Sequence, residues 1–390
     1  MHAFEFATAK KILVGQGKAK ELPAIARLYG IGRCLVVTGR SPHRLASVIA
    51  LLRESGIELN LFQVPGEPTV DLVRKGVQCA TENSCDGVVA IGGGSALDAG
   101  KAIAALMRND GDVLDYLEII GKGRKLSQPS APWIAVPTTA GTGSEVTTNA
   151  VLFASDQRIK VSLRSPWMLP VAAIVDCELT LSLPRSQTLA CSMDALTQLI
   201  EPYVCNRANP LTDGFCLQGL PLVSRSLKRV CTHGHDREAR CDMSLASLFG
   251  GLALTNAGLG VVHGFAGPLG GMFDAPHGSI CAALLPHGMR ANLACLRRGQ
   301  NTSCDPGEII RRYRVVAQIL TGCNDAEPED AVQFIQDLAA ELGVPTLSSF
   351  GMRREDVNEV VEKAQRASSM KANPVTLSTE ELMDVYLGAL

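Results

Sequence analysis

Four short apolar runs in the first half of the chain constrain the fold more than any other feature of the sequence. Continuous apolar runs of this length are typical of strands buried on both faces of a parallel sheet. Between them, residues 43–55 and 70–82 place apolar side chains at helical spacing. The alternation of strand and helix predicts an α/β domain with right-handed crossovers. The runs span residues 34–37, 87–91, 133–136 and 172–175.

The second half of the chain has a different pattern. After Leu183-Pro184, helical spacing of apolar residues recurs in long segments, without a series of alternating strands. We therefore expect an α/β domain over residues 1–184 and an all-helical domain over 185–390. Two domains agree with a length of 390 residues at roughly 150 residues per domain. The helical segments are 187–204, 210–227, 309–320 and 330–342.

Charge and cysteine content limit the partners and the compartment. Lys and Arg number 37 and Asp and Glu 39, a net charge of −2 without long runs of either sign, so no nucleic-acid partner is expected. The 13 cysteines include no CxxC pair, and the N-terminus lacks the regions of a signal peptide. We expect reduced thiols and a cytoplasmic protein.

Residues 244–273 contain no Asp, Glu, Lys or Arg. This stretch exceeds the roughly 20 residues that a transmembrane helix needs. It also carries many glycines, together with Asn256, His263 and Pro268, which a lipid-facing helix accommodates poorly. A buried helix and turn is the favoured interpretation, with no membrane partner.

A glycine turn follows the second predicted strand. Gly92-Gly93-Gly94-Ser95 separates that strand from a helix that runs through Asp98 and Lys101. Glycines at such a turn let backbone N–H groups approach a ligand closely, and the helix N-terminus favours an anion such as a pyrophosphate. The spacing differs from GxGxxG, so a turn without a ligand remains the alternative.

A polar cluster follows the next strand, from Pro137 through Thr138, Thr139 and Thr142 to Asn149. Its position at the carboxyl end of a strand places it at the same edge of the sheet as the glycine turn, where α/β sheets bind nucleotides. The alternative is an ordinary loop rich in Ser, Thr and Gly.

These motifs resemble the group III, or iron-containing, alcohol dehydrogenase family, within the dehydroquinate synthase-like group. The resemblance covers essentially the whole chain. It implies a dinucleotide-binding α/β domain, a helical domain and an active site between them, in which the turn at Gly92–Ser95 faces the helix of Asp194 across one crevice. It also implies a homo-oligomer such as a dimer. The motifs that carry it are Phe4-Glu5-Phe6, Val14-Gly15-Gln16-Gly17, Gly92-Gly93-Gly94-Ser95, Pro137 to Glu145, Asp194-Ala195-Leu196-Thr197, Pro276-His277-Gly278 and Asn373-Pro374.

The family holds a divalent metal with one Asp and three His. By the resemblance, Asp194, His263 and His277 are ligands, but the remaining ligand position is Gln198. Asp194 and Gln198 share one helix face at i and i+4, and an amide oxygen binds Fe²⁺ or Zn²⁺ less well than imidazole does. We expect a weakly bound metal, with polar residues lining a metal-free site as the alternative.

A second departure lies at position 267. Many family members have another His here, associated with proton transfer, whereas this chain has Gly267. A proton relay would then use water, the nicotinamide ribose or His277.

The resemblance implies reversible hydride transfer between a nicotinamide and an alcohol or aldehyde, with the metal as Lewis acid. It places Asp98, Asn149 and His277 as catalytic residues. The implied cofactor-binding residues are Gly93, Gly94, Ser95, Asp98, Thr138, Thr139, Thr142, Thr147 and Lys160, together with Gly39, Arg40 and Ser41.

The choice between NADP and NAD depends on the residues after the first predicted strand. NAD-preferring relatives have an acidic residue there, whereas this chain has Gly39-Arg40-Ser41 with Arg44 nearby. An Arg at this point can pair with a 2′-phosphate, so NADP(H) is favoured and NAD stays open. The alternative is that both arginines are ordinary solvated charges.

Three other functions share these features. A metal-independent reductase of the maleylacetate reductase type agrees with the loss of His at positions 198 and 267. A lyase similar to dehydroquinate synthase would use the same nucleotide and metal without net reduction. A non-catalytic cofactor-binding protein is the least specific alternative.

Overall fold

The computed structural model describes residues 3–299 and 304–390, and the chain divides into two compact units. One unit is Ala7–Leu183, and the other is Pro184–Leu390 together with a short segment that ends at Phe6. This division differs by one residue from the expected boundary at 184/185, and it assigns the start of the chain to the helical unit.

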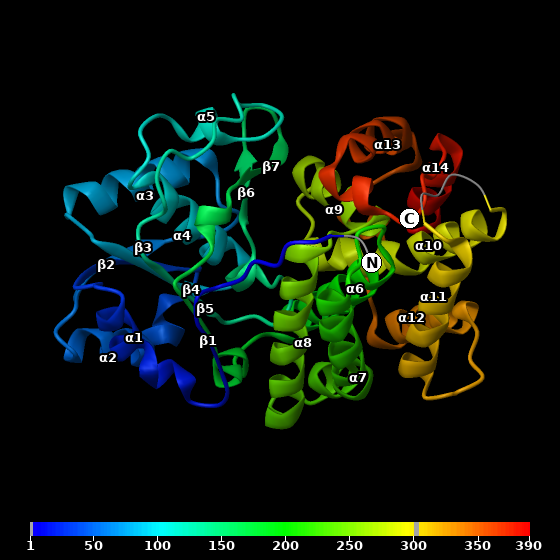
Figure 1. The fold of residues 1–390 in the computed structure, drawn as a ribbon, viewed down its shortest axis with the longest axis horizontal. Helices are drawn as coiled ribbons and strands as arrows, with labels where there is room; N and C mark the ends of the chain where they lie inside the picture. The colour runs from blue at the N-terminus through cyan, green and yellow to red at the C-terminus, as the bar shows by residue number, and fades with distance from the viewer. Residues whose placement is uncertain (1–2, 300–303) are drawn as a thin grey trace. The chain divides into compact units, whose positions relative to one another are not determined.

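Among the described residues of the first unit, six strands form a parallel sheet in the order β1-β8-β5-β4-β2-β3 (Figure 1). The four predicted runs are β2, β4, β5 and β8. The strands of the sheet are β1 (Ile12–Val14), β2 (Arg33–Thr38), β3 (Glu58–Gln63), β4 (Gly87–Gly92), β5 (Trp133–Pro137) and β8 (Ala172–Val175).

Helices cover both faces of this sheet (Figure 1). Alternate side chains of β2 enter two separate apolar cores, because successive residues of a strand point to opposite faces. Cys34 and Val36 pack in the core formed with α1 (Leu22–Leu28) and α2 (Ala46–Glu54). Leu35 and Val37 pack in the core formed with α3 (Val70–Glu82) and α4 (Gly94–Leu106). The predicted α/β domain is confirmed.

Several parts of this unit lie outside the sequence prediction. Strand β3 is an edge strand with several partly exposed residues, so it lacks the continuous apolar run of its neighbours. An antiparallel hairpin of β6 (Asn149–Ala154) and β7 (Ile159–Arg164) follows the polar cluster. A short helix, α5 (Val113–Tyr116), precedes β5.

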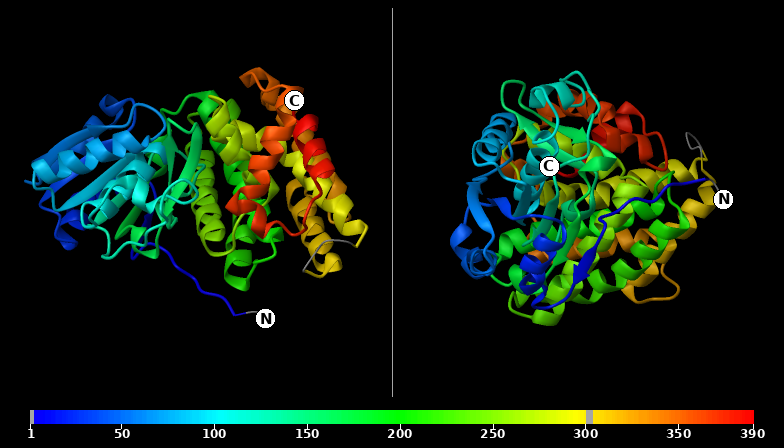
Figure 2. Two further views of the ribbon diagram at one scale, coloured as in Figure 1. Left: turned by 90° about the horizontal axis from the view of Figure 1, so that it is seen from above. Right: turned by 60° about the vertical axis from the view of Figure 1, so that its left-hand side comes forward.

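The second unit is helical throughout its described residues, as predicted. Helices α6, α7 and α8 pack against one another, and they are the long green helices of Figure 2. The helices are α6 (Arg185–Val204), α7 (Pro210–Thr232), α8 (Arg237–Asn256), α9 (Val261–Met272), α10 (His277–Arg297), α11 (Pro306–Thr321), α12 (Pro328–Leu342), α13 (Val357–Arg366) and α14 (Thr379–Gly388).

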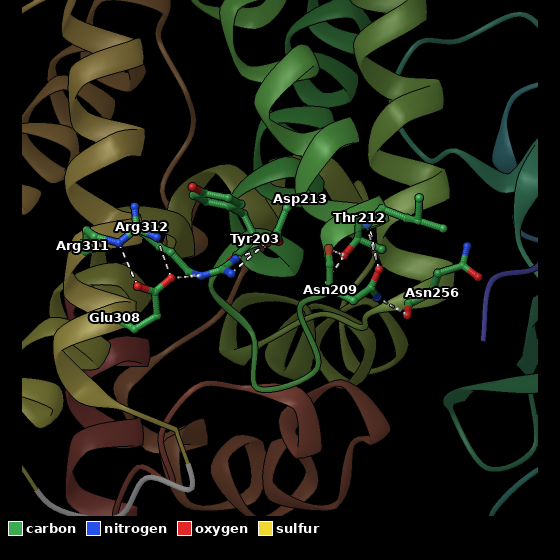
Figure 3. Close-up of polar contacts among 9 residues, drawn as sticks. Tyr203, Asn209, Thr212, Asp213, Asn256, Glu308, Arg311 and Arg312 are labelled. Carbon is green, nitrogen blue, oxygen red and sulfur yellow. Dashed lines mark hydrogen bonds and ion pairs between the residues drawn. The ribbon is translucent and has the colours of Figure 1, made fainter. Parts of the chain in front are cut away.

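Polar contacts fix the turn between α6 and α7 (Figure 3). Arg312 of α11 donates to both carboxylate oxygens of Asp213, at 2.7 and 2.8 Å, and to the backbone oxygen of Tyr203 at 2.8 Å. Asn209 caps α7 in a reciprocal pair with Thr212, which satisfies N–H groups that the helix itself cannot. The C-terminal end of α6 is therefore held firmly.

No single helix among residues 3–299 and 304–390 is both long and apolar enough to cross a membrane. Helices α8 and α9 meet that criterion only as a pair, and they are bent by 97° at the break between them.

The expectation that all cysteines are reduced is wrong at two positions. Cys177 and Cys241 are disulfide-bonded. No spacing motif distinguishes these two residues in the sequence, because disulfide pairing depends on proximity in the fold.

Candidate active site

The glycine turn lies against the polar cluster that follows β5. Thr138 N donates to Gly92 O at 2.9 Å. A Cβ atom on Gly93 would lie 3.0 Å from the methyl group of Thr139, and one on Gly94 only 2.8 Å from that of Thr142. The two segments expected at one edge of the sheet are therefore in contact, and the contact is too close at Gly94 for a larger residue unless Thr142 shifts.

The turn has the form of an anion site. Helix α4 begins at Gly94, and Gly93 is its N-cap with no side-chain hydrogen bond to the first turn. Free N–H groups and the positive end of the helix dipole meet here, and Ser95 adds a hydroxyl group next to them. A pyrophosphate is the ligand that such a turn suits best.

A buried lysine supports the polar cluster. Lys101 Nζ is fully buried and donates to Thr147 Oγ1 and Asn149 O, both at 2.6 Å, and to Ser144 Oγ at 3.2 Å. Burial lowers the pKa of Lys101 to about 8, although Asp98 opposes this shift. Sequence reasoning noted Lys101 in the motif and assigned it no role. The sequence gives no signal for this role, because all three hydrogen-bond partners of Lys101 Nζ lie more than 40 positions away along the chain.

Asp98 holds the same segment. One carboxylate oxygen accepts from Ser144 Oγ at 2.5 Å and the other from Val151 N at 2.9 Å. Burial raises the pKa of Asp98, opposed by Lys101 and Ser144. Through these two contacts Asp98 positions the segment, and its catalytic role stays a prediction. Asn149 is the first residue of β6, at the end of the segment that Asp98 and Lys101 fix.

The residues expected to select the cofactor follow β2 directly. Arg40, between Gly39 and Ser41, is exposed, and its Nε donates to Pro65 O at 2.8 Å. Gln63 Nε2 donates to Arg40 O at the same distance. These contacts fix the base of the guanidinium group at the end of the strand.

Lys160 lies on β7, in the same unit as the glycine turn. Its side chain is largely buried, and its Nζ forms an ion pair with Glu67 Oε1 at 3.0 Å.

The predicted metal ligands come together in the helical unit. Asp194 and Gln198 share a face of α6, His263 lies in the first turn of α9, and His277 is the first residue of α10. His263 Nε2 lies 3.3 Å from Asp194 Oδ1, and His277 Nε2 lies 3.9 Å from it. The centroids of the two imidazole rings lie 5.3 Å apart. The structure thus brings Asp194, His263 and His277 around one point.

Glu201, one further turn along α6, orients this cluster. Its Oε2 lies 2.6 Å from His263 Nδ1, and its Oε1 accepts from Val262 N at 2.7 Å. An ionised carboxylate can only accept, so Nδ1 carries the proton of this contact and Nε2 faces Asp194. Carboxylate-to-histidine contacts of this kind are the usual support of a metal-binding imidazole. Sequence analysis missed Glu201, although its spacing of seven from Asp194 places both residues on one helix face.

A fourth donor atom belongs to Cys281, one turn after His277 on α10. Its Sγ lies 3.8 Å from His263 Nε2 and 3.7 Å from His277 Nε2. One donor atom from each of Asp194, His263, His277 and Cys281 lies within 4.8 Å of all the others. Sequence analysis expected reduced thiols and gave Cys281 no role.

Opposite charges determine the ionisation of this buried cluster. Burial alone would lower the pKa of His263, but Cys281, Asp194 and Glu201 outweigh it and raise that pKa well above its usual value. Burial alone would raise the pKa values of Asp194 and Cys281, but His263 and His277 lower both. The two imidazoles therefore supply the positive charge that stabilises the anionic forms of Asp194 and Cys281.

Two buried polar atoms test whether a divalent cation fits here. Asp194 Oδ1 and Gln198 Oε1 have no hydrogen-bond partner, since the contact of Asp194 with His263 lacks hydrogen-bond geometry. Leaving such acceptors unsatisfied costs about 1–3 kcal/mol each, and both are acceptors that a cation would satisfy. With two imidazoles beside them, the donor set fits a divalent transition metal.

Gly267 lies next to open space on α9. A Cβ atom on this residue would meet no atom within 4 Å. The surface of α9 is therefore open at this point, one turn after His263.

Comparisons with known proteins identify the family of the chain. Residues 9–177 match the iron-containing alcohol dehydrogenase family, and residues 188–390 match the Fe-containing alcohol dehydrogenase family, C-terminal. Alcohol dehydrogenase 4 of Schizosaccharomyces pombe is 34% identical over 383 residues, which are 97% of this chain and 87% of that protein.

Two further comparisons extend the likeness. An NAD-dependent methanol dehydrogenase of Bacillus methanolicus is 30% identical over 388 residues, 97% of each chain. A crystal structure of 1,3-propanediol oxidoreductase superimposes with a TM-score of 0.92 at 31% identity and covers 100% of both chains. The chain belongs to the iron-containing alcohol dehydrogenase family.

Proposed function

We propose that this enzyme, an oxidoreductase acting on CH–OH groups, transfers hydride reversibly between NADP(H) and a small alcohol or aldehyde with the help of a divalent metal. The observation that carries the proposal is the cluster of Asp194, His263 and His277. Two buried oxygens there, Asp194 Oδ1 and Gln198 Oε1, have no hydrogen-bond partner. Membership of the family favours net oxidoreduction over the lyase reaction of a dehydroquinate synthase-like enzyme.

The glycine turn binds the pyrophosphate of the cofactor in this proposal. Gly93 and Gly94 offer backbone N–H groups at the start of α4, and Ser95 adds a hydroxyl donor. The threonines packed on the turn, Thr139 and Thr142, keep its shape. Lys101 and Asp98 act through the segment from Ser144 to Val151, which they hold in place from the buried side.

Arg40 selects the phosphorylated cofactor. It follows β2 with its Nε bound to a backbone oxygen, and residues 39–41 contain no carboxylate that would repel a 2′-phosphate. A guanidinium group pairs well with phosphate. The methanol dehydrogenase relative is named as NAD-dependent, so the proposed preference for NADP(H) differs from the cofactor in the name of that relative.

Asp194, His263 and His277 would hold the metal, with Gln198 beside them. When bound, a divalent metal supplies Lewis-acid stabilisation of negative charge on the substrate oxygen. Glu201 keeps the proton on His263 Nδ1 and so leaves the lone pair of Nε2 available to a metal. His277 is more exposed than the other ligands, with 36% of its side chain accessible, and is the residue best placed to exchange protons with water.

Turnover of an aldehyde panel with NADPH and NADH tests this function. The panel should contain unbranched aldehydes of increasing length and aldehydes carrying an acidic group, and the readout is the nicotinamide absorbance. We expect oxidation of NADPH, loss of activity after chelation and recovery with added Zn²⁺ or Fe²⁺.

Undiminished activity after complete removal of metal would instead establish a metal-independent reductase of the maleylacetate reductase type. No absorbance change with any aldehyde or alcohol would reject the proposed oxidoreduction. A preference for NADH would reject only the role of Arg40 in cofactor selection and would leave the proposed oxidoreduction standing.

A further inference from the structure

Helix α10 carries two residues of the metal cluster on one face. His277 and Cys281 are four residues apart, so their side chains lie one above the other. Cys281 is fully buried, and its Sγ faces the Nε2 atoms of both histidines. The thiol therefore points to the same place as the predicted ligands.

The spacing of the donor atoms matches a coordination shell. Ligands at 2.0–2.3 Å from a tetrahedral metal are separated from one another by about 3.3–3.8 Å. Asp194 Oδ1 lies 3.3 Å from His263 Nε2 and 3.9 Å from His277 Nε2. Cys281 Sγ lies 3.8 and 3.7 Å from the same two nitrogens. The N–O distances exceed the 2.7–3.2 Å of a good hydrogen bond, so the four atoms surround a space of the right size for one cation.

The chemistry of the donors favours the thiol over the amide. Gln198 occupies the position where the family has its remaining histidine, and its neutral oxygen is a weak ligand for borderline metals. A thiolate is anionic and soft, which suits Zn²⁺. Together with Asp194 it also balances both positive charges of the ion, whereas Gln198 balances none.

We propose that Cys281 is a metal ligand in this enzyme and replaces the histidine that Gln198 has displaced. The ligand set becomes Asp194, His263, His277 and Cys281, again four protein donors, to which a substrate oxygen would add as a fifth ligand. The sulfur shifts the metal preference toward Zn²⁺. This inference rests on the proposed metal-dependent function, because it assumes that the cluster binds a divalent ion.

Substitution of Co²⁺ into the full-length protein tests the sulfur directly. Cobalt bound to a thiolate has an intense charge-transfer band in the near ultraviolet, which oxygen and nitrogen ligands do not produce. We expect this band in the wild-type protein at one Co²⁺ per chain. Cys281→Ser should abolish it and weaken Co²⁺ binding by more than about 100-fold, since loss of a mere outer-shell partner already costs 10–100-fold.

Two variants serve as matched controls. Cys216, on α7, is as buried as Cys281 but lies outside the cluster, so Cys216→Ser should keep the band. Gln198→Ala removes the competing donor and should also keep the band. Retention of the band in Cys281→Ser would show that the sulfur comes from another cysteine and would overturn the inference.

The wild-type spectrum alone can refute the proposal, so the test does not depend on the folding of a variant. Co²⁺ bound at one per chain without the charge-transfer band would overturn the role of Cys281 and leave the metal-dependent function standing. Failure of the wild-type protein to bind Co²⁺ or Zn²⁺ at all would overturn both.

Discussion

Replacing Glu201 by Gln tests how the metal cluster is positioned. The Glu201 carboxylate accepts two hydrogen bonds, one from His263 Nδ1 and one from the backbone N–H of Val262. A glutamine side chain has only one oxygen for these two donors. Either the buried N–H of Val262 loses its acceptor, or the imidazole moves its proton to Nε2 and can no longer bind a metal through that atom.

The size of the effect follows from this lost acceptor. An unsatisfied buried donor costs about 1–3 kcal/mol, which corresponds to roughly 5- to 150-fold in an affinity. Measured losses of outer-shell partners in metal sites fall in the same range, 10–100-fold. We therefore expect Glu201→Gln to weaken Zn²⁺ binding by about one to two orders of magnitude.

Competition between the metal-free protein and a chromophoric chelator measures this affinity. The control is Glu341→Gln, because Glu341 is exposed and its ion pair, within the described part of the chain, is with Lys228 at the surface. A Zn²⁺ affinity of Glu201→Gln within about threefold of wild type, the range of an ordinary surface substitution, would refute the positioning role of Glu201.

Three further substitutions test other parts of the account. In Gly94→Ala the new Cβ lies 2.8 Å from the Thr142 methyl, so overpacking of about 1–3 kcal/mol should weaken NADPH binding, measured by nicotinamide fluorescence; unchanged binding would contradict the phosphate turn. Burial raises the pKa of Glu145 to about 7 from its ordinary 4.5. Between these two pH values the folded state keeps a proton that the unfolded state loses. The free energy of unfolding therefore falls by roughly 3 kcal/mol as the pH rises from the ordinary pKa to the raised one. Glu145→Gln should remove this fall in urea titrations, and an identical pH dependence in both proteins would contradict it. Gly278→Ala places a Cβ 2.1 Å from Ala190 O and should lower the melting temperature by several degrees; an unchanged value would show that α10 and α6 can move apart there.

Much of the fold follows from the sequence because burial leaves a periodic signal. Strands β2, β4, β5 and β8 are continuous apolar runs, and α3 extends over the predicted residues 70–82. Strand β3 was missed because its partly exposed face interrupts the apolar run. The hairpin β6–β7 was read as part of a polar segment, since its first residue, Asn149, belongs to the motif that precedes it.

The site was less predictable, because its key contacts join distant residues. The motifs identified Asp194, His263 and His277, which the structure brings together. Glu201 meets His263 across 62 positions, and Cys281 meets it across 18. Only the helical spacing of these residues from Asp194 and His277 signalled their position, and many buried residues share such spacing.

X-ray absorption at the zinc edge of the Zn²⁺-loaded enzyme tests the central claim most directly. We predict one sulfur at about 2.3 Å together with nitrogen and oxygen ligands near 2.0–2.1 Å, and no sulfur in Cys281→Ser. A wild-type zinc shell of nitrogen and oxygen alone would contradict the assignment of Cys281 as the fourth ligand.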